Sequence, residues 1–224
     1  MISSLRLPRL LLLSILVLIA LGLLYLDFGS SLSLAQSSVN NSTVAPDISS
    51  LPWFITRTAG ITAYLLMFLV VLLGTGMTTS YIYRFINPVQ AWVVHKYLSL
   101  ALGVALLTHI LALLFDKFVD FNWLDILIPF ASSYNPIFLS LGIFAFYILL
   151  VVIFSSLFFR LKYKKAWRGI HYAVYPLFML SFLHGAFIGT DSNTVWMQTA
   201  YLSTGLVFSG LFIYRFIIYI FKKS

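Results

Sequence analysis

Two apolar stretches, HKYLSLALGVALLTH at residues 95–109 and HYAVYPLFMLSFLH at residues 171–184, each begin and end with histidine. Together they hold all four histidines of the chain. Each stretch lies within an apolar segment close to the roughly 20 residues that cross the hydrocarbon core of a bilayer. Burying an imidazole in lipid without a partner is unfavourable, so histidines inside a membrane span are candidates for a functional site.

The composition is that of an integral membrane protein. Hydrophobic residues make up 61% of the 224 residues, charged residues 9%, and the mean hydropathy is +1.00, whereas soluble domains carry roughly 25% charged residues. The sequence therefore predicts an all-α bundle of six transmembrane helices joined by mostly short loops. The expected spans are residues 10–26, 53–73, 89–115, 137–159, 169–188 and 199–221.

Charged residues separate by side of the membrane. All six acidic residues fall on one side of the predicted bundle: Asp27, Asp47, Asp116, Asp120, Asp125 and Asp191. Only Arg57 and Lys117 join them there, and the other basic residues fall on the opposite side: Arg6, Arg9, Arg84, Lys96, Arg160, Lys162, Lys164, Lys165, Arg168, Arg215, Lys222 and Lys223. The positive-inside rule then puts both termini in the cytoplasm and predicts a multi-pass protein of the plasma (cytoplasmic) membrane. The net charge of +8 is explained by orientation and contact with membrane lipid, so no nucleic-acid partner is expected.

The first 52 residues are expected to form a separate unit, a signal-anchor helix followed by an external linker rich in Ser and Asn. The apolar run at residues 10–26 and the following SLSLAQSS also resemble a signal peptide with a cleavage site after Ala35. The 17-residue run is long for a signal peptide, which favours a retained helix.

The histidines are expected to form two levels across the membrane. The spans at 89–115 and 169–188 run in the same direction, so His95 and His171 meet near the cytoplasmic side, and His109 and His184 near the outer side. The 1.5 Å rise per residue separates the levels by about 20 Å, which leaves room for one haem at each level. The alternatives are core histidines bonded to neighbouring groups and, less favoured, zinc sites, since each level offers only two nitrogens.

The second pair needs a break in its helix. Fourteen residues place His95 and His109 within about 40° of each other, whereas 13 residues place His171 and His184 about 140° apart on a straight helix. Pro176 lies between them. We therefore expect a kink or local unwinding near this proline, and a straight helix would contradict the expectation.

At these residues the chain resembles the ferric-reductase-like transmembrane domain, a group that includes yeast-type ferric reductases, the membrane half of NADPH oxidases and bacterial haem subunits of methionine sulfoxide reductase. The resemblance covers about residues 53–221. Besides the two histidine spacings it rests on WFITRTAG at 53–60, IPFASSYNP at 128–136, WRGIH at 167–171 and HGAFIGTD at 184–191.

The resemblance implies that residues 53–224 form a haem-binding transmembrane domain with two haem b groups. His95 and His171 would be the axial ligands of the inner haem, and His109 and His184 those of the outer haem. Electrons would pass from a cytoplasmic or quinol donor to an external acceptor, as in a ferric reductase.

Relatives of the oxidase and yeast reductase types carry a cytoplasmic FAD/NADPH domain after the sixth span, and no FAD or NADPH site is found in this chain. We therefore expect an oxidoreductase component supplied by a separate flavoprotein or by quinol. One alternative is a haem subunit serving a partner extracytoplasmic reductase such as methionine sulfoxide reductase, although such subunits generally lack one of the four ligands. An alternative of another class is a haem-free proton-coupled transporter, which would need a polar pathway.

Two arginines are candidate contacts of the haem propionates. Arg57 is the one cation in the outer half of its span, and a buried guanidinium needs an anion. Snorkelling to the outer interface is the alternative. Arg168 and, less clearly, Lys96 lie at the level of the inner haem, where the positive-inside rule alone would also place them.

Overall fold

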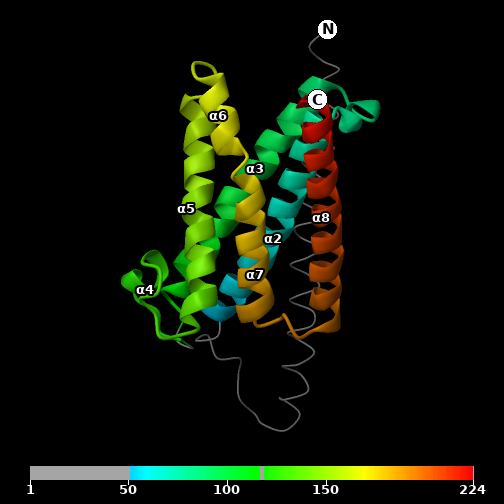
Figure 1. Cartoon of the computed structure of the whole chain (residues 1–224). Helices are drawn as coiled ribbons and strands as arrows, with labels where there is room; N and C mark the ends of the chain where they lie inside the picture. Colours follow the sequence, from blue (N-terminus) through cyan, green and yellow to red (C-terminus); the bar gives the residue numbers. More distant parts are fainter. Residues whose placement is uncertain (1–50, 117–118, 224) are drawn as a thin grey trace, which may run out of the picture.

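The computed structural model describes residues 51–116 and 119–223, and the expected first span at 10–26 and its linker lie outside them. The described residues form helices and no strands (Figure 1). In chain order the elements are α2 (Leu51–Thr78), the 3₁₀ helix η3 (Tyr81–Arg84), α3 (Pro88–Leu113), α4 (Trp123–Leu127), α5 (Pro136–Phe158), α6 (Lys164–His171), α7 (Val174–Ile188) and α8 (Val195–Lys223).

Four helical segments of the described chain are long and apolar enough to cross a membrane. They are α2, α3, α5 and the segment Lys164–Ile188 that combines α6 and α7. These segments match the expected second to fifth spans. The expected sixth span at 199–221 falls within α8, a helix of 29 residues, and its membrane crossing stays a prediction. The total of six spans and the side on which each terminus lies also stay predictions.

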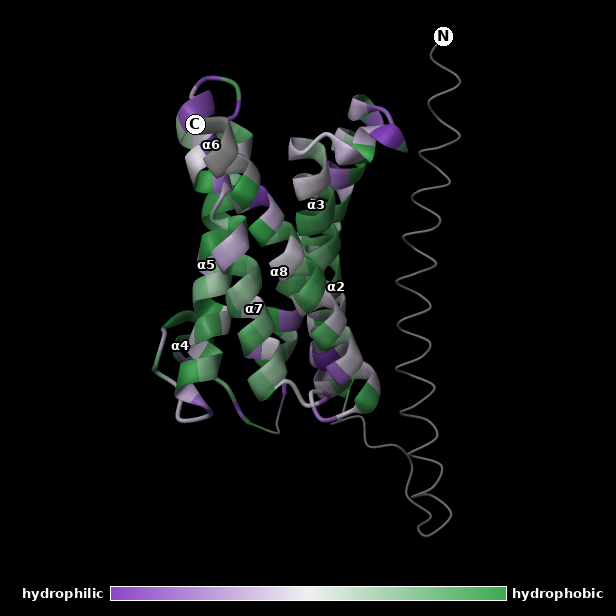
Figure 2. Ribbon diagram, turned by 45° about the vertical axis from the view of Figure 1, so that its right-hand side comes forward, coloured by the Kyte–Doolittle hydropathy of each residue, from purple (hydrophilic) through white to green (hydrophobic). Residues whose placement is uncertain are grey.

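The long helices form two antiparallel pairs with an additional helix beside them. In Figure 1, α2, α5 and α8 run in one direction, and α3 and α7 in the other. The closest packing is between α2 and α3 and between α5 and α7, while α8 packs against α2 and α7. The loops that carry η3 and α6 lie at one end and α4 at the other. Figure 2 shows that hydrophobic residues dominate the middle of the bundle.

Asparagine and proline together begin two of the spanning helices. Asn87 precedes α3, its side-chain oxygen accepts a hydrogen bond from the backbone N–H of Gln90 at 2.8 Å, and Pro88 is the first helical residue. Asn135 precedes α5 with φ of 42°, in the left-handed region, and Pro136 follows. Proline suits the first helical turn because its missing N–H is not needed there. These Asn–Pro pairs define where α3 and α5 start, and the first of them thereby fixes the positions of His95 and His109 along the bundle.

The helix that carries the second histidine pair is interrupted, as expected. Helix α6 ends at His171, and α7 begins at Val174, two residues before Pro176. Across this junction the backbone N–H of Ala173 bonds to the Ile170 carbonyl at 2.9 Å, a tightened turn that skips the normal i−4 partner. Pro176 has no N–H to offer to the preceding turn. The local unwinding changes the direction in which His171 and His184 project.

Aromatic side chains fill the centre of the bundle. Phe178 of α7 is 1% exposed and stacks against Phe208 of α8 at 4.4 Å and Tyr64 of α2 at 5.8 Å between ring centroids. The Tyr64 hydroxyl also forms a hydrogen bond with the Thr204 hydroxyl at 2.6 Å. This cluster joins α2, α7 and α8.

Replacing Phe178 with alanine should destabilise the folded protein strongly. Removing a fully buried phenylalanine leaves a cavity and costs about 3–5 kcal/mol. The adjacent Met179, 43% exposed, is the control, since Met179→Ala should change the free energy of unfolding by about 0.5 kcal/mol or less. Denaturant unfolding in detergent micelles measures both, and equal losses in the two variants would contradict the assignment of Phe178 to the core.

Candidate functional site

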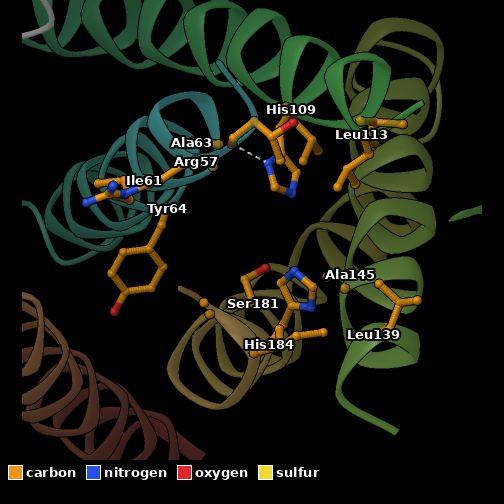
Figure 3. Close-up of a pocket in the computed structure, with 18 of the residues that line it drawn as sticks. Arg57, Ile61, Ala63, Tyr64, His109, Leu113, Leu139, Ala145, Ser181 and His184 are labelled. Atoms are coloured by element: carbon orange, nitrogen blue, oxygen red, sulfur yellow. Dashed lines mark hydrogen bonds between the residues drawn. The ribbon is translucent and has the colours of Figure 1, made fainter. Parts of the chain in front are cut away.

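His109 and His184 line one cavity near the end of the bundle that carries α4. The cavity is bordered by α2, α3, α5, α7 and the start of α8, and most of its lining is apolar. Figure 3 shows the two imidazole rings pointing toward one another across the cavity, His109 from α3 and His184 from α7. The structure therefore brings together the two histidines that the sequence predicted for the outer level.

Backbone carbonyls of the neighbouring helices orient both of these rings. Nδ1 of His109 lies 2.8 Å from the carbonyl oxygen of Thr56 in α2, and Nδ1 of His184 lies 2.8 Å from that of Phe138 in α5. A carbonyl only accepts, so Nδ1 carries the hydrogen in each ring. Nε2 is then the nitrogen with a free lone pair, which is the form of imidazole that binds a metal.

Glycine residues of the neighbouring helices allow the His109 and His184 rings to approach the backbone closely. A Cβ atom built on Gly60 would lie 2.8 Å from Nδ1 of His109, and one on Gly142 would lie 2.7 Å from Nδ1 of His184. Real Cβ atoms do not approach other atoms so closely. The carbonyl–imidazole bonds therefore require glycine at both positions.

His95 and His171 form the second pair, near the opposite end of the bundle. Their ring centroids are 6.4 Å apart, with an angle of 56° between the ring planes. His95 packs on Gly74 of α2, whose added Cβ would lie 3.2 Å from Cε1. The backbone of Val70 interacts with the His95 ring, but the geometry falls short of a hydrogen bond, and Nδ1 is buried without a partner among the described residues.

The spacing and the donor set fit an axial imidazole pair. A metal–imidazole bond of roughly 2.0–2.1 Å, with about 1.1 Å from the nitrogen to the ring centre, places two rings on opposite sides of one metal ion about 6.3 Å apart. The observed separation between His95 and His171 is 6.4 Å. Over residues 51–116 and 119–223, no three His, Cys, Asp or Glu side chains gather as a metal site. Each level offers two imidazoles, and imidazole is a ligand that haem iron accepts.

Arg57 pairs with Asp191 at the outer edge of the cavity. The Nε and Nη2 atoms of the guanidinium contact the two carboxylate oxygens, and the side chains are 14% and 6% exposed. The Trp53 ring lies 4.9 Å from the guanidinium carbon. The sequence predicted that Arg57 needs an anion, and the structure supplies Asp191, a partner that sequence reasoning missed. The one available signal was that Asp191 directly follows the fifth span. Contact of Arg57 with a haem propionate stays a prediction.

The basic candidates of the inner level lie on the surface. Arg168 is exposed on α6, and Lys96 is exposed on α3. The Lys96 ammonium lies 5.7 Å from the Trp92 ring centroid, and the guanidinium of Arg160 lies 5.1 Å from the same ring. The structure thus shows one aromatic ring with two cations beside it, and propionate pairing by Arg168 stays a prediction.

The fold and the site define a helical membrane protein with two levels of paired imidazoles. Residues 59–182, more than half of the chain, match the family described as ferric reductase like transmembrane component, and the chain belongs to this family. Members of this family generally bind haem, and together with the apolar helices the match makes this a multi-pass integral membrane protein. The comparisons with curated proteins and with solved structures found no match.

Gly142→Ala should destabilise the protein, whereas Gly103→Ala should not. At position 142 the new methyl group would collide with His184, and forcing extra volume into a packed site costs about 1–3 kcal/mol. At position 103 no atom lies within 4 Å of an added Cβ, so the variant should gain up to about 0.5–1 kcal/mol from helix propensity. Unfolding in micelles gives both values, and a change of the same sign in both variants would refute the close-approach role of Gly142.

The Arg57–Asp191 pair should behave as a buried ion pair. Either single variant, Arg57→Met or Asp191→Leu, removes one partner of this contact, and breaking a buried pair in this way costs about 3–5 kcal/mol. The double variant Arg57→Met/Asp191→Leu should recover most of that loss, because replacing both charges with apolar groups is often near neutral. A double-mutant cycle on unfolding free energies measures the coupling, and purely additive losses would show that the two side chains act independently.

Proposed function

We propose that this chain carries electrons across the membrane through two bis-histidine b haems, from a cytoplasmic or quinol donor to an external acceptor. The observation that carries the proposal is the pairing of all four histidines across the two helix pairs. His95 faces His171 at 6.4 Å between ring centroids, and His109 faces His184 across one cavity.

The residues present fit the group that the family generally binds. His95 and His171 would hold the inner haem, and His109 and His184 the outer haem. Haem would supply a one-electron redox centre at each of these pairs. The protein holds the rings: the Thr56 and Phe138 carbonyls accept the Nδ1 hydrogens of the outer pair and keep Nε2 available.

The charge distribution supports outward transfer. The end of the bundle that carries η3 and α6 is basic, with Arg84, Arg160 and Arg168, and the opposite end carries Asp125 and Asp191. By the positive-inside rule the basic end faces the cytoplasm. An electron moving outward then follows an inside-negative potential, gaining about 2.3 kcal/mol per 100 mV for a complete crossing.

The proposal predicts a pigmented protein. The purified full chain should show a dithionite-reducible b-type spectrum with about two haems per chain. His109→Ala and His95→Ala should each remove one haem, because each variant deletes one axial ligand from a different level. Thr108→Ala is the matched control, since this exposed neighbour of His109 bonds to the Val104 carbonyl of its own helix and to no other helix in the described part of the chain.

A fully folded chain without pigment would refute the proposal. That result would favour the haem-free proton-coupled transporter, which a proton-flux assay in vesicles would then test. If both haems disappear in either histidine variant while the chain stays folded, the assignment of one pair to each level is wrong.

A further inference from the structure

The surfaces that hold the four histidines repeat from one helix pair to the other. In α2, Gly60 faces His109 and Gly74 faces His95. In α5, Gly142 faces His184, and Ser156, 14 residues further along, faces His171. Gly60 and Gly74 are also 14 residues apart. Helices α2 and α5 therefore present equivalent positions at the two levels, and three of the four carry glycine.

Ser156 differs from the other three positions by a side chain. At the glycine positions an added Cβ would lie 2.7–3.2 Å from the nearest imidazole atom, so the ring rests directly on the helix. At position 156 a Cβ is already present, and the ring of His171 must stand further from α5. The Ser156 hydroxyl occupies this gap, with its oxygen 3.4 Å from Nδ1 of His171.

The Ser156 hydroxyl has three hydrogen-bonding contacts: Val152, Trp167 and His171. Ser156 Oγ donates to the Val152 carbonyl at 2.8 Å and accepts from Nε1 of Trp167 at 3.2 Å. A hydroxyl has one hydrogen and two lone pairs, so one lone pair remains for His171. Nδ1 of His171 must then be the donor, which leaves Nε2 as the free nitrogen, as in the carbonyl-bonded rings.

Trp167 completes this arrangement from α6. Its ring lies 5.2 Å from that of His171 between centroids, at an interplanar angle of 38°, while its N–H bonds to Ser156. Tryptophan therefore packs on the histidine and holds the hydroxyl that orients it. The Trp167–Ser156 bond joins α6 to α5 in the helix that ends at the interruption at residues 172–173.

We infer that Ser156 is a positioning residue for His171 that sets the properties of the inner haem separately from those of the outer haem. This inference rests on the proposed function. Both outer histidines donate to carbonyls at 2.8 Å. His171 instead forms a longer hydrogen bond, 3.4 Å, with the Ser156 hydroxyl, which also accepts a hydrogen bond from Trp167. A hydrogen-bond acceptor on the N–H of a ligating imidazole makes that imidazole a stronger electron donor to the metal. The histidines of the inner haem would therefore differ in donor strength from those of the outer haem.

The test is a redox titration of Ser156→Ala in the full-length, haem-loaded chain. Losing the acceptor weakens the His171 imidazole as a donor to ferric iron, so the midpoint potential of one haem should rise while that of the other stays unchanged. The shifted haem should be the one missing from His95→Ala. Ser155→Ala is the matched control, because this neighbouring hydroxyl also donates to the Val152 carbonyl but has no bond to His171 or Trp167 among the contacts of the described chain. Its potentials should match the wild type.

Unchanged potentials in Ser156→Ala, a parallel shift of both haems, or the same shift in Ser155→Ala would overturn the inference. If Ser156→Ala loses the inner haem outright, Trp167→Phe decides the question. This variant removes the competing donor and strengthens the acceptor available to His171, so the inner potential should fall, and an unchanged potential would reject the role of Ser156. A wild-type chain without haem would refute the proposed function itself, a result distinct from every outcome above.

Discussion

The close contact between an imidazole and the backbone of a neighbouring helix is the constraint on which the rest of this structure depends. An imidazole without a partner is unfavourable inside a membrane, and for His109 and His184 the acceptors are helix carbonyls of a neighbouring helix. Thr56 and Phe138 accept the additional hydrogen bonds at 2.8 Å. Such an approach is possible only where the helix surface is bare, as at Gly60 and Gly142. These glycines therefore let α2 approach His109 and α5 approach His184.

This constraint explains the arrangement of two helix pairs. Helix α2 supports the histidines of α3, and α5 supports those of α6 and α7, so the functional rings project from the inner faces of both pairs. A straight helix would direct His171 and His184 to different sides. The turn between α6 and α7 removes this conflict, because the N–H of Ala173 bonds to the carbonyl three residues earlier. The interruption of the helix is thus part of the site.

Charge has separate roles at the two ends of the bundle. Beside the cavity of His109 and His184, Arg57 pairs with Asp191 next to Trp53, which makes a buried guanidinium tolerable in an apolar setting. At the opposite end the basic side chains remain exposed, and Lys96 and Arg160 lie against the Trp92 ring. The first arrangement borders the cavity of His109 and His184, while the second lies exposed on the surface.

Hydropathy and histidine spacing were enough to predict the helical membrane fold and the two imidazole pairs, because span length and residue period are local properties. The family was predicted from these spacings together with the short motifs that resemble it. The break near Pro176 followed from the same arithmetic. The partner of Arg57 was not predictable, since Asp191 is distant in sequence. The supporting carbonyls of Thr56 and Phe138 could not be found either, because every residue has a carbonyl and no sequence pattern distinguishes the one that accepts. The role of Ser156 became visible only when α2 and α5 were compared in space. Local chemistry thus decided the spans and the candidate residues, while helix packing decided which atoms of the neighbouring helices lie against each ring.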